Sequence, residues 1–337
     1  MKTLFAACAG LAMTALLATT AVAEISERTI RVSAGVNEDH PMGDGVRAMT
    51  ECLAEKSDGK IKMLAFWGGA LGSDQQQTQS LRSSTQEMTI TSTSPLVGIL
   101  PALGAFDLPF IFNSAEEADA VLDGEFGAYV AGMLPEKGLV NLAYWENGFR
   151  NLTNSRRPVT KWEDISGLKV RVMQNNIFID TFNNMGANAV PMSFGEVFSA
   201  LDTKAIDAQE NPFVTIDTTK FYEVQKYLSI TQHAYTPYLA LFSKPIWDTY
   251  SPEEQALLKE CAIVGRDAQR AAARALSSQS LENLKAHGME VIEFTPEEQQ
   301  RMREKAQPVV DKHAPEIGLE VVERLNAAIA KARGATN

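Results

Sequence analysis

The sequence predicts an α/β protein made of two lobes, which crossing strands and one long helix connect. Strand and helix patterns alternate between residues 30 and 93, a βαβα rhythm that is typical of a parallel or mixed sheet with helices on both faces. A polar, proline-bearing segment at 146–159 indicates one place where the chain crosses between the lobes, and we expect a return crossing near 233–245. The length of 337 residues also favours two domains, at roughly 150 residues for each domain.

Residues 1–23 have the pattern of a cleaved secretory signal peptide. A positively charged start is followed by an apolar run at 4–17 and by a small-residue cleavage site, AVA, at 21–23. The run is too short to span a membrane, and Cys8 lies too early within it to favour lipid attachment. We therefore expect a mature chain that starts at Glu24 and is exported.

Two cysteines, Cys52 and Cys261, remain in the predicted mature chain. An exported protein folds in an oxidising compartment, which permits a disulfide between them. Because a disulfide requires the two backbones to lie close together, and the sequence does not give that distance, their pairing stays open at this stage.

The first elements follow one another with recognisable patterns. Residues 30–34 alternate as a strand does, and residues 46–53 show the spacing of one helix face. Residues 61–66 and 88–93 are further strands. A glycine-rich turn and a helix lie between these two strands, and a serine or an aspartate at 73–74 caps that helix.

Later helices have starts in which a serine or threonine precedes a glutamate by three residues, the capping-box pattern. These starts lie at 114–117, 193–196, 251–254 and 295–298. From Ser251 to His287 the sequence is rich in helix-forming residues, and its one proline stands at the first helical position, where proline is tolerated. This stretch predicts one unusually long helix that could run across both lobes.

Composition and missing motifs disfavour several classes of function. The formal net charge of -11 argues against nucleic acid or an anionic membrane as a partner. The sequence contains no helical zinc-binding His/Glu pair, no CxxC, no phosphate-binding loop motif and no nucleophile elbow. Its four histidines are scattered, which disfavours a metal centre. We expect neither a cofactor nor a metal, and the missing motifs lower the odds of an enzyme.

Three polar residues stand in apolar or turn settings and are candidates for binding a ligand. Arg171 lies in the apolar strand pattern SGLKVRV, Arg150 follows WENGF, and Asn211 precedes a proline. Each has an ordinary structural explanation, because strand arginines are usually solvated and Asn-Pro commonly initiates a turn. The functional alternative is that a guanidinium fixed on a strand presents a flat fork of donors. That fork matches a carboxylate with two hydrogen bonds and does not lose its proton.

Five longer segments occur in an order that resembles a known family. They are LGAFDLPFIF, GFRNLTNSRRPV, DISGLKVRVM, MGANAVPMSFGEVFSALDTKAIDAQENP and VQKYLSITQHAYTP. Over essentially the whole mature chain they are similar to solute-binding proteins of tripartite ATP-independent periplasmic (TRAP) transporters, of the dicarboxylate-binding (DctP) type. The resemblance implies a two-lobe periplasmic-binding-protein fold, a clamshell with crossing strands and a long lobe-spanning helix. Where the family commonly has QTGVVDG, this protein has DTKAIDA, a change that we expect to affect a turn and not the pocket.

The resemblance implies that Arg171 forms the main salt bridge to a ligand carboxylate. It implies that Asn211 holds either that arginine or the ligand, and that Arg150 lies near the same carboxylate. If both arginines hold one carboxylate, a monoacid such as a hexuronate fits best. If Arg150 faces the far end of the ligand, a C4-dicarboxylate fits.

Five further residues are candidates for lining the ligand pocket. By resemblance, Phe194 lines the pocket, Asn37 reaches the ligand from the other lobe, and Gln174 is a polar contact. Trp145 either lies against the carbon face of the ligand or belongs to the core. Thr93, at the end of a strand, offers its hydroxyl either to the ligand or to its own backbone.

The crossings predict that lobe I comprises residues 24–149 plus about 237–276, and lobe II residues 150–236 plus about 277–337. The predicted protein is not an enzyme but a periplasmic TRAP solute-binding protein. It captures a carboxylate ligand, such as a sugar acid, and delivers it to the membrane permease subunits. We expect a monomer. Two other functions stay open: a secreted enzyme that acts on organic acids, and the binding protein of an ATP-driven importer.

Overall fold

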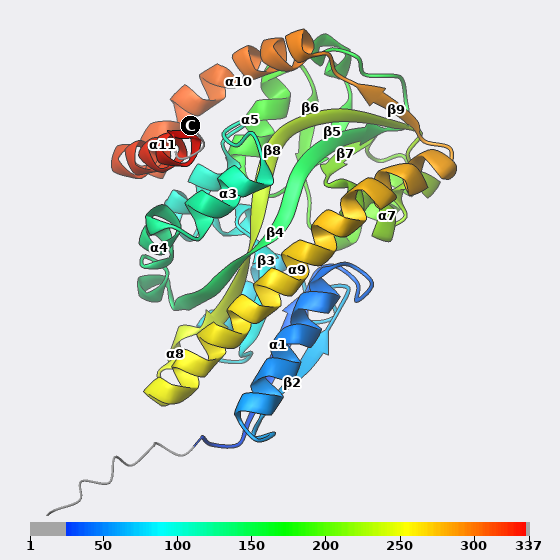
Figure 1. Ribbon diagram of the computed structural model, residues 1–337. Helices are drawn as coiled ribbons and strands as arrows, with labels where there is room; N and C mark the ends of the chain where they lie inside the picture. Colours follow the sequence, from blue (N-terminus) through cyan, green and yellow to red (C-terminus); the bar gives the residue numbers. More distant parts are fainter. Residues whose placement is uncertain (1–24, 335–337) are drawn as a thin grey trace, which may run out of the picture.

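The computed structural model describes residues 25–334 (Figure 1). The predicted signal peptide and its cleavage site lie outside these residues. Within them, nine strands form one sheet in the order β2-β1-β3-β8-β4-β7-β5-β6, and β9 pairs with β8. The strands are β1 (Arg28–Ala34), β2 (Ile61–Phe66), β3 (Met88–Ser92), β4 (Leu139–Asn154), β5 (Lys169–Val172), β6 (Asn188–Pro191), β7 (Ala208–Asn211), β8 (Tyr227–Ser243) and β9 (Glu290–Glu293).

Helices pack around this sheet, and several of them begin where the sequence predicts. They are α1 (Met42–Lys56), α2 (Asp74–Arg82), α3 (Ala115–Leu122), α4 (Glu125–Ala131), α5 (Asn176–Asn184), α6 (Val197–Asp202), α7 (Phe213–Thr218), α8 (Lys244–Trp247), α9 (Pro252–Ala286), α10 (Pro296–Ile317) and α11 (Leu319–Gly334). The N-cap of α2 is Ser73, which forms a capping box with Gln76, so Asp74 is the first helical residue. The predicted strands and helices up to residue 93 are therefore confirmed.

Three of the four predicted capping boxes start α-helices. Ser114, Ser251 and Thr295 each accept a hydrogen bond from the backbone N–H three residues later. The fourth, at Ser193, is different: its hydroxyl bonds the side chain of Glu196 instead of a backbone N–H. The backbone therefore makes a 3-10 turn, η5 (Phe194–Glu196), before α6 begins.

The strands β4 and β8 cross the molecule from one end to the other. They are antiparallel, with a register that runs from Leu139 opposite Ser243 to Asn154 opposite Tyr227. At one end β8 pairs with β3, next to the parallel strands β1 and β2. At the other end β4 pairs with β7, next to the parallel strands β5 and β6. These are the predicted crossings, and they give the protein its two-lobe α/β fold (Figure 1).

The long helix predicted from 251 to 287 is α9, a single helix of 35 residues that runs beside the crossing strands (Figure 1). Glycines let α9 approach α1 closely. A Cβ on Gly265 would lie 2.7 Å from Cζ2 of Trp145 and 2.8 Å from the carbonyl oxygen of Gly45. Because such contacts are far too short, larger residues there would push the two helices apart.

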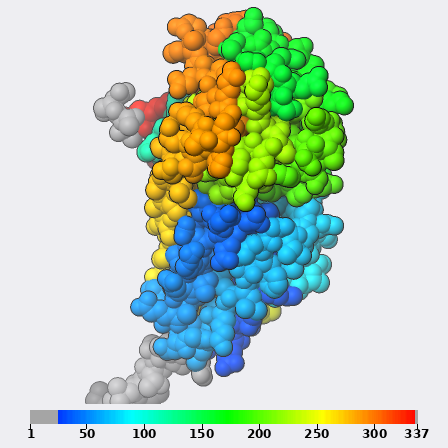
Figure 2. Space-filling view, turned by 90° about the vertical axis from the view of Figure 1, so that its right-hand side faces the viewer, coloured from blue at the N-terminus to red at the C-terminus, as the bar shows by residue number. Residues whose placement is uncertain are grey.

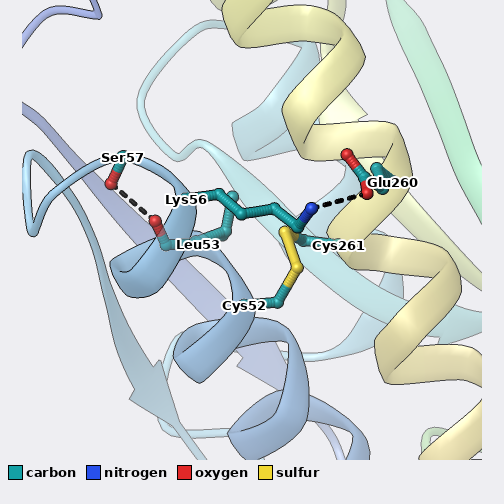
Figure 3. The surroundings of a disulfide bond; sticks show 6 residues. All are labelled: Cys52, Leu53, Lys56, Ser57, Glu260 and Cys261. Carbon is teal, nitrogen blue, oxygen red and sulfur yellow. Dashed lines mark hydrogen bonds and ion pairs between the residues drawn. A yellow bond between two sulfur atoms is a disulfide. The ribbon is translucent and has the colours of Figure 1, made fainter.

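A disulfide also joins α1 to α9. Cys52 and Cys261 have an S–S distance of 2.05 Å and a Cα–Cα distance of 5.5 Å (Figure 3). An ion pair between Lys56 and Glu260, with Nζ and Oε1 2.8 Å apart, lies beside the bond. The structure thus answers the question that the sequence left open, and the pairing fits a protein that folds in an oxidising compartment.

The outer surface shows the two bodies of the molecule. In Figure 2 the N-terminal segments, blue to cyan, form the lower body, and green and orange segments form the upper one. The C-terminal helices α10 and α11 pack against the η2 turn (Pro101–Asp107), and α11 also packs against α3 and α4. None of the helices within residues 25–334 combines the length and the apolar character needed to cross a membrane.

Candidate ligand-binding site

A pocket collects residues from the carboxyl ends of parallel strands at both ends of the sheet. Gly35 follows β1 and Ser92 ends β3, while Met173 follows β5 and Asn211 ends β7. In α/β sheets ligands bind outside the carboxyl ends of the strands, where neighbouring loops diverge. The crossing strands bring two such edges to face each other around a space of about 590 Å³, including its open mouth.

Arg171 is a buried cation on the wall of this pocket. It lies on β5 between β6 and β7, and it is only 3% exposed. Its Nε and Nη2 atoms donate hydrogen bonds to the carbonyl oxygen of Met192 at 3.0 and 2.7 Å, which fixes the guanidinium plane. No carboxylate within the described part of the protein lies within 4.0 Å of it. A buried charge without a partner is costly, so this arrangement suits an arriving anion.

Burial lowers the pKa of Arg171 to about 10, and the charge of Arg150 contributes to the decrease, although Glu210 and Asp74 oppose it. The guanidinium therefore stays positively charged near neutral pH. The lowered pKa reflects the free-energy cost of holding this charge away from water. A ligand carboxylate would remove that cost.

Arg150 also lines the pocket, but its charge is compensated within the protein. Its Nη2 lies 2.8 Å from Oε1 of Glu210, and its Nε bonds the other carboxylate oxygen. Both side chains are at most 1% exposed. Burial alone would raise the pKa of Glu210, but Arg150 and a hydrogen bond from His233 lower it to about 2. Glu210 is therefore ionised, and Arg171 carries the uncompensated positive charge of the two arginines.

Asn211 connects this ion pair to the pocket. Its Oδ1 accepts a hydrogen bond from Nη2 of Arg150 at 3.1 Å, and its Nδ2 donates to Gln209 at 2.6 Å. The resemblance implied that Asn211 holds the main arginine or the ligand; in the structure its side chain holds Arg150. Phe194 and Gln174 line the pocket as well. Five predicted site residues are thus brought together.

The other three predicted residues lie elsewhere. Trp145 is fully buried between α1 and α9, where its Nε1 donates to the carbonyl oxygen of Ala262 at 3.2 Å. Thr93 is buried and donates its hydroxyl to Asp107 at 3.3 Å. Asn37 is exposed in the loop after β1. None of the three is among the residues that line the pocket, so their contact with a ligand stays a prediction.

Sequence reasoning missed several pocket residues, of which Asp74 is the most telling. It is the first residue of α2, is half-buried, and lines the pocket from the end of the sheet opposite to that of Arg171. Tyr238 on β8 and Thr215 on α7 also line it. The glycine-rich turn before α2 was the available signal, because such turns often bring a helix start close to a ligand.

A second buried acid, Asp107, lies next to the pocket. Its carboxylate accepts hydrogen bonds from Oγ of Ser94 and from Nδ2 of Asn175, both at 2.7 Å. Asn175 is also the N-cap of α5, since its Oδ1 accepts from the N–H of Ile177 at 2.7 Å. Burial raises the pKa of Asp107 to about 7, despite the hydrogen bonds from Ser94 and Thr93.

We expect Asp107→Asn to change how stability depends on pH. An unfolded aspartate loses its proton near pH ~3.9, whereas folded Asp107 keeps it to about 7. The folded state binds more protons between these values, so this residue's contribution to stability is complete below the lower pKa and is lost as the pH rises to the upper one. The free energy of unfolding changes by at most ~1.4 kcal/mol per pH unit through this residue.

Urea unfolding between pH 4.5 and 7.5 should show the Asp107→Asn variant gaining stability relative to wild type as the pH rises. The exposed Asp39→Asn is the matched control, and parallel curves for wild type and Asp107→Asn would contradict the assignment.

Comparison with known proteins gives one family. The family model "DctP: Bacterial extracellular solute-binding protein, family 7" matches residues 32–316. The 2,3-diketo-L-gulonate-binding periplasmic protein YiaO of Escherichia coli is 34% identical over 276 residues, which cover 82% of this chain and 84% of that protein.

Solved structures of solute-binding proteins are also similar to this protein. The sugar acid binding protein DctPAm of Advenella mimigardefordensis, in complex with galactonate, superposes with a TM-score of 0.89 at 45% identity, covering 91% of this protein and 99% of that one. A TRAP periplasmic solute-binding protein from Ochrobactrum anthropi has a TM-score of 0.83 at 46% identity, covering 93% and 98% of the two proteins. Its C-terminus is bound in its ligand-binding pocket.

Proposed function

Because this chain belongs to bacterial extracellular solute-binding protein family 7, the DctP family, we propose that it captures an organic acid with one carboxylate and holds that carboxylate on Arg171. Members of this family are transport proteins that bind substrates and are not enzymes. TRAP solute-binding proteins take small organic acids and work with membrane permease subunits. The delivered cargo of this protein is therefore an organic acid.

One observation carries the proposal: Arg171 is a buried, uncompensated cation in the pocket. The guanidinium is held in place before the ligand arrives, because Met192 orients two of its nitrogens and β5 fixes its backbone. Little ordering is then left for binding to impose. Each charge-assisted hydrogen bond contributes ~1.5–3 kcal/mol. With burial of the remaining ligand surface, an affinity near ~1 μM, about -8 kcal/mol, is within reach.

The charge balance supports a monoacid over a C4-dicarboxylate. Arg150 is compensated by Glu210, so a second carboxylate would find no free cation on it. Two of the similar proteins fit this view, since 2,3-diketo-L-gulonate and galactonate each present a single acid group. We infer that the ligand is a sugar acid or a similar monocarboxylate.

The remaining parts of the proposal concern location and movement. We propose export to the periplasm by the predicted signal peptide, with action as a monomer. Lobe I is residues 24–149 plus about 237–276, and lobe II is 150–236 plus about 277–337. Because both lobes contribute to the pocket, a ligand that bridges them stabilises the closed state, and β4, β8 and α9 accommodate the hinge motion.

A thermal-shift screen of the mature protein tests this function. We expect hexuronates and aldonates to raise the melting temperature, and succinate and malate to have little effect. A ligand at ~100 times its Kd adds ~2.7 kcal/mol of stability, which corresponds to a shift of several degrees. The acid should be recovered unchanged after long incubation. If none of these acids stabilised the protein, or if the dicarboxylates stabilised it most, the proposal would be wrong.

A further inference from the structure

The pocket holds a carboxylate that faces the site of the ligand. Asp74 lies at the start of α2, and its side chain is half-buried in the pocket wall. Gly35 leaves room for it: Oδ1 of Asp74 is 3.4 Å from where a Cβ on Gly35 would stand, and Cδ1 of Phe194 is 3.9 Å from the same point. Asp74 and Phe194 thus both border the space beside Gly35 in the pocket.

Asp74 and Arg171 are opposite charges that share one pocket without touching. Burial raises the pKa of Asp74 and lowers that of Arg171, and the charge of each opposes the shift of the other. The two side chains are nevertheless farther apart than the 4.0 Å of an ion pair. Within residues 25–334, neither forms an ion pair with any other residue. A carboxylate has two oxygens and can accept several hydrogen bonds, so Asp74 has acceptor positions for a ligand. The space between the two charges is where a ligand would lie.

Arg171 and Asp74 need different groups on the ligand. Arg171 offers only donors, so it requires an acceptor such as a carboxylate. An ionised Asp74 offers only acceptors, so it requires a donor. A ligand hydroxyl meets this demand, whereas a second carboxylate would place two negative charges together in a water-poor site, which is unfavourable.

Given the proposed capture of a carboxylate by Arg171, we propose that Asp74 determines specificity by accepting a hydrogen bond from a ligand hydroxyl. It thereby selects hydroxylated monocarboxylates and rejects dicarboxylates of the same length. The cation on one lobe and the carboxylate on the other also give the ligand a direction in the pocket. The acid end lies at lobe II and a hydroxylated carbon lies at lobe I.

Pairs of acids that differ at one carbon test this directly. Galactonate and galactarate share a carbon skeleton, but the last carbon is a hydroxymethyl group in the first and a carboxylate in the second; gluconate and glucarate form a second pair. Calorimetric titration of wild type should show at least tenfold tighter binding of the aldonate in the pair that binds. In Asp74→Asn, aldonate affinity should fall and the preference over the aldarate should shrink at least tenfold, because the repelling charge is gone.

Controls separate this inference from a general charge effect. Asp44→Asn changes the net charge equally at an exposed site on α1 and should leave the preference unaltered. Asp74→Ser serves as a second variant if the asparagine variant unfolds at a lower temperature than the titration. Equal binding of both acids by wild type, an unchanged preference in Asp74 variants, or no binding of either aldonate would overturn the role of Asp74. Loss of all carboxylate binding would instead overturn the proposed function itself.

Discussion

Replacing Arg171 with methionine is expected to abolish the response to the ligand while leaving the free protein folded. The variant removes the donors that hold the carboxylate, so the ligand charge would enter a closed pocket without a partner. Breaking a buried charge pair in this way costs at least ~3 kcal/mol, roughly 100-fold or more in Kd. Calorimetric titration with the acid found in the thermal-shift screen measures the loss.

The stability of the free variant makes this prediction specific. In the free protein the Arg171 guanidinium is buried without an anion, and burial lowers its pKa to about 10. Methionine has a similar length and no charge to desolvate, so Arg171→Met without ligand should be as stable as wild type or more stable. A residue whose role is structural would give the opposite result, a loss of stability without ligand.

Two further variants sharpen the test. Arg171→Lys keeps the charge but loses the planar fork, so we expect an affinity between those of wild type and Arg171→Met. Arg156→Met removes an arginine whose side chain is 63% exposed, and it should bind like wild type. If Arg171→Met retained the full ligand-induced rise in melting temperature, the carboxylate would have to lie elsewhere.

Opening the Cys52–Cys261 disulfide is expected to have the largest effect on stability. The two cysteines are 209 residues apart in the sequence, and the bond joins α1 to α9. Chain-entropy arguments give ~5 kcal/mol for a loop of that size, and measured losses are typically ~2–5 kcal/mol. Urea unfolding of the Cys52→Ala, Cys261→Ala double variant should show a loss in this range.

The single variants and a reductant provide the controls. Because either substitution removes the same bond, each single variant should lose nearly as much stability as the double variant. Dithiothreitol should destabilise wild type and have no effect on the double variant. Neither cysteine lines the pocket, so the folded double variant should keep its ligand affinity. A double variant as stable as wild type would show that the bond contributes nothing to folding.

Arg150 and Arg171 have different surroundings in the folded protein, which shows what a local sequence pattern can and cannot reveal about the site. Arg171 and Arg150 both stand out in the sequence as cations in strand or turn settings. Only the folded protein brings Glu210, 60 residues from Arg150, into contact with it. That ion pair compensates the charge of Arg150, whereas Arg171 forms no ion pair with any residue in the described range 25–334.

The sequence by itself determined the strands and helices up to residue 93 and the long helix α9, because these depend on periodicity, capping residues and turn residues that are neighbours along the backbone. The role expected for Arg171 came from the resemblance to a family. The tertiary structure alone decided that Trp145 fills the α1–α9 interface, that the cysteines pair, and that Asp74 faces Arg171 across one pocket. Proximity and charge compensation depend on which distant segments the crossing strands bring together. No local sequence pattern encodes how close two such segments lie in the folded protein.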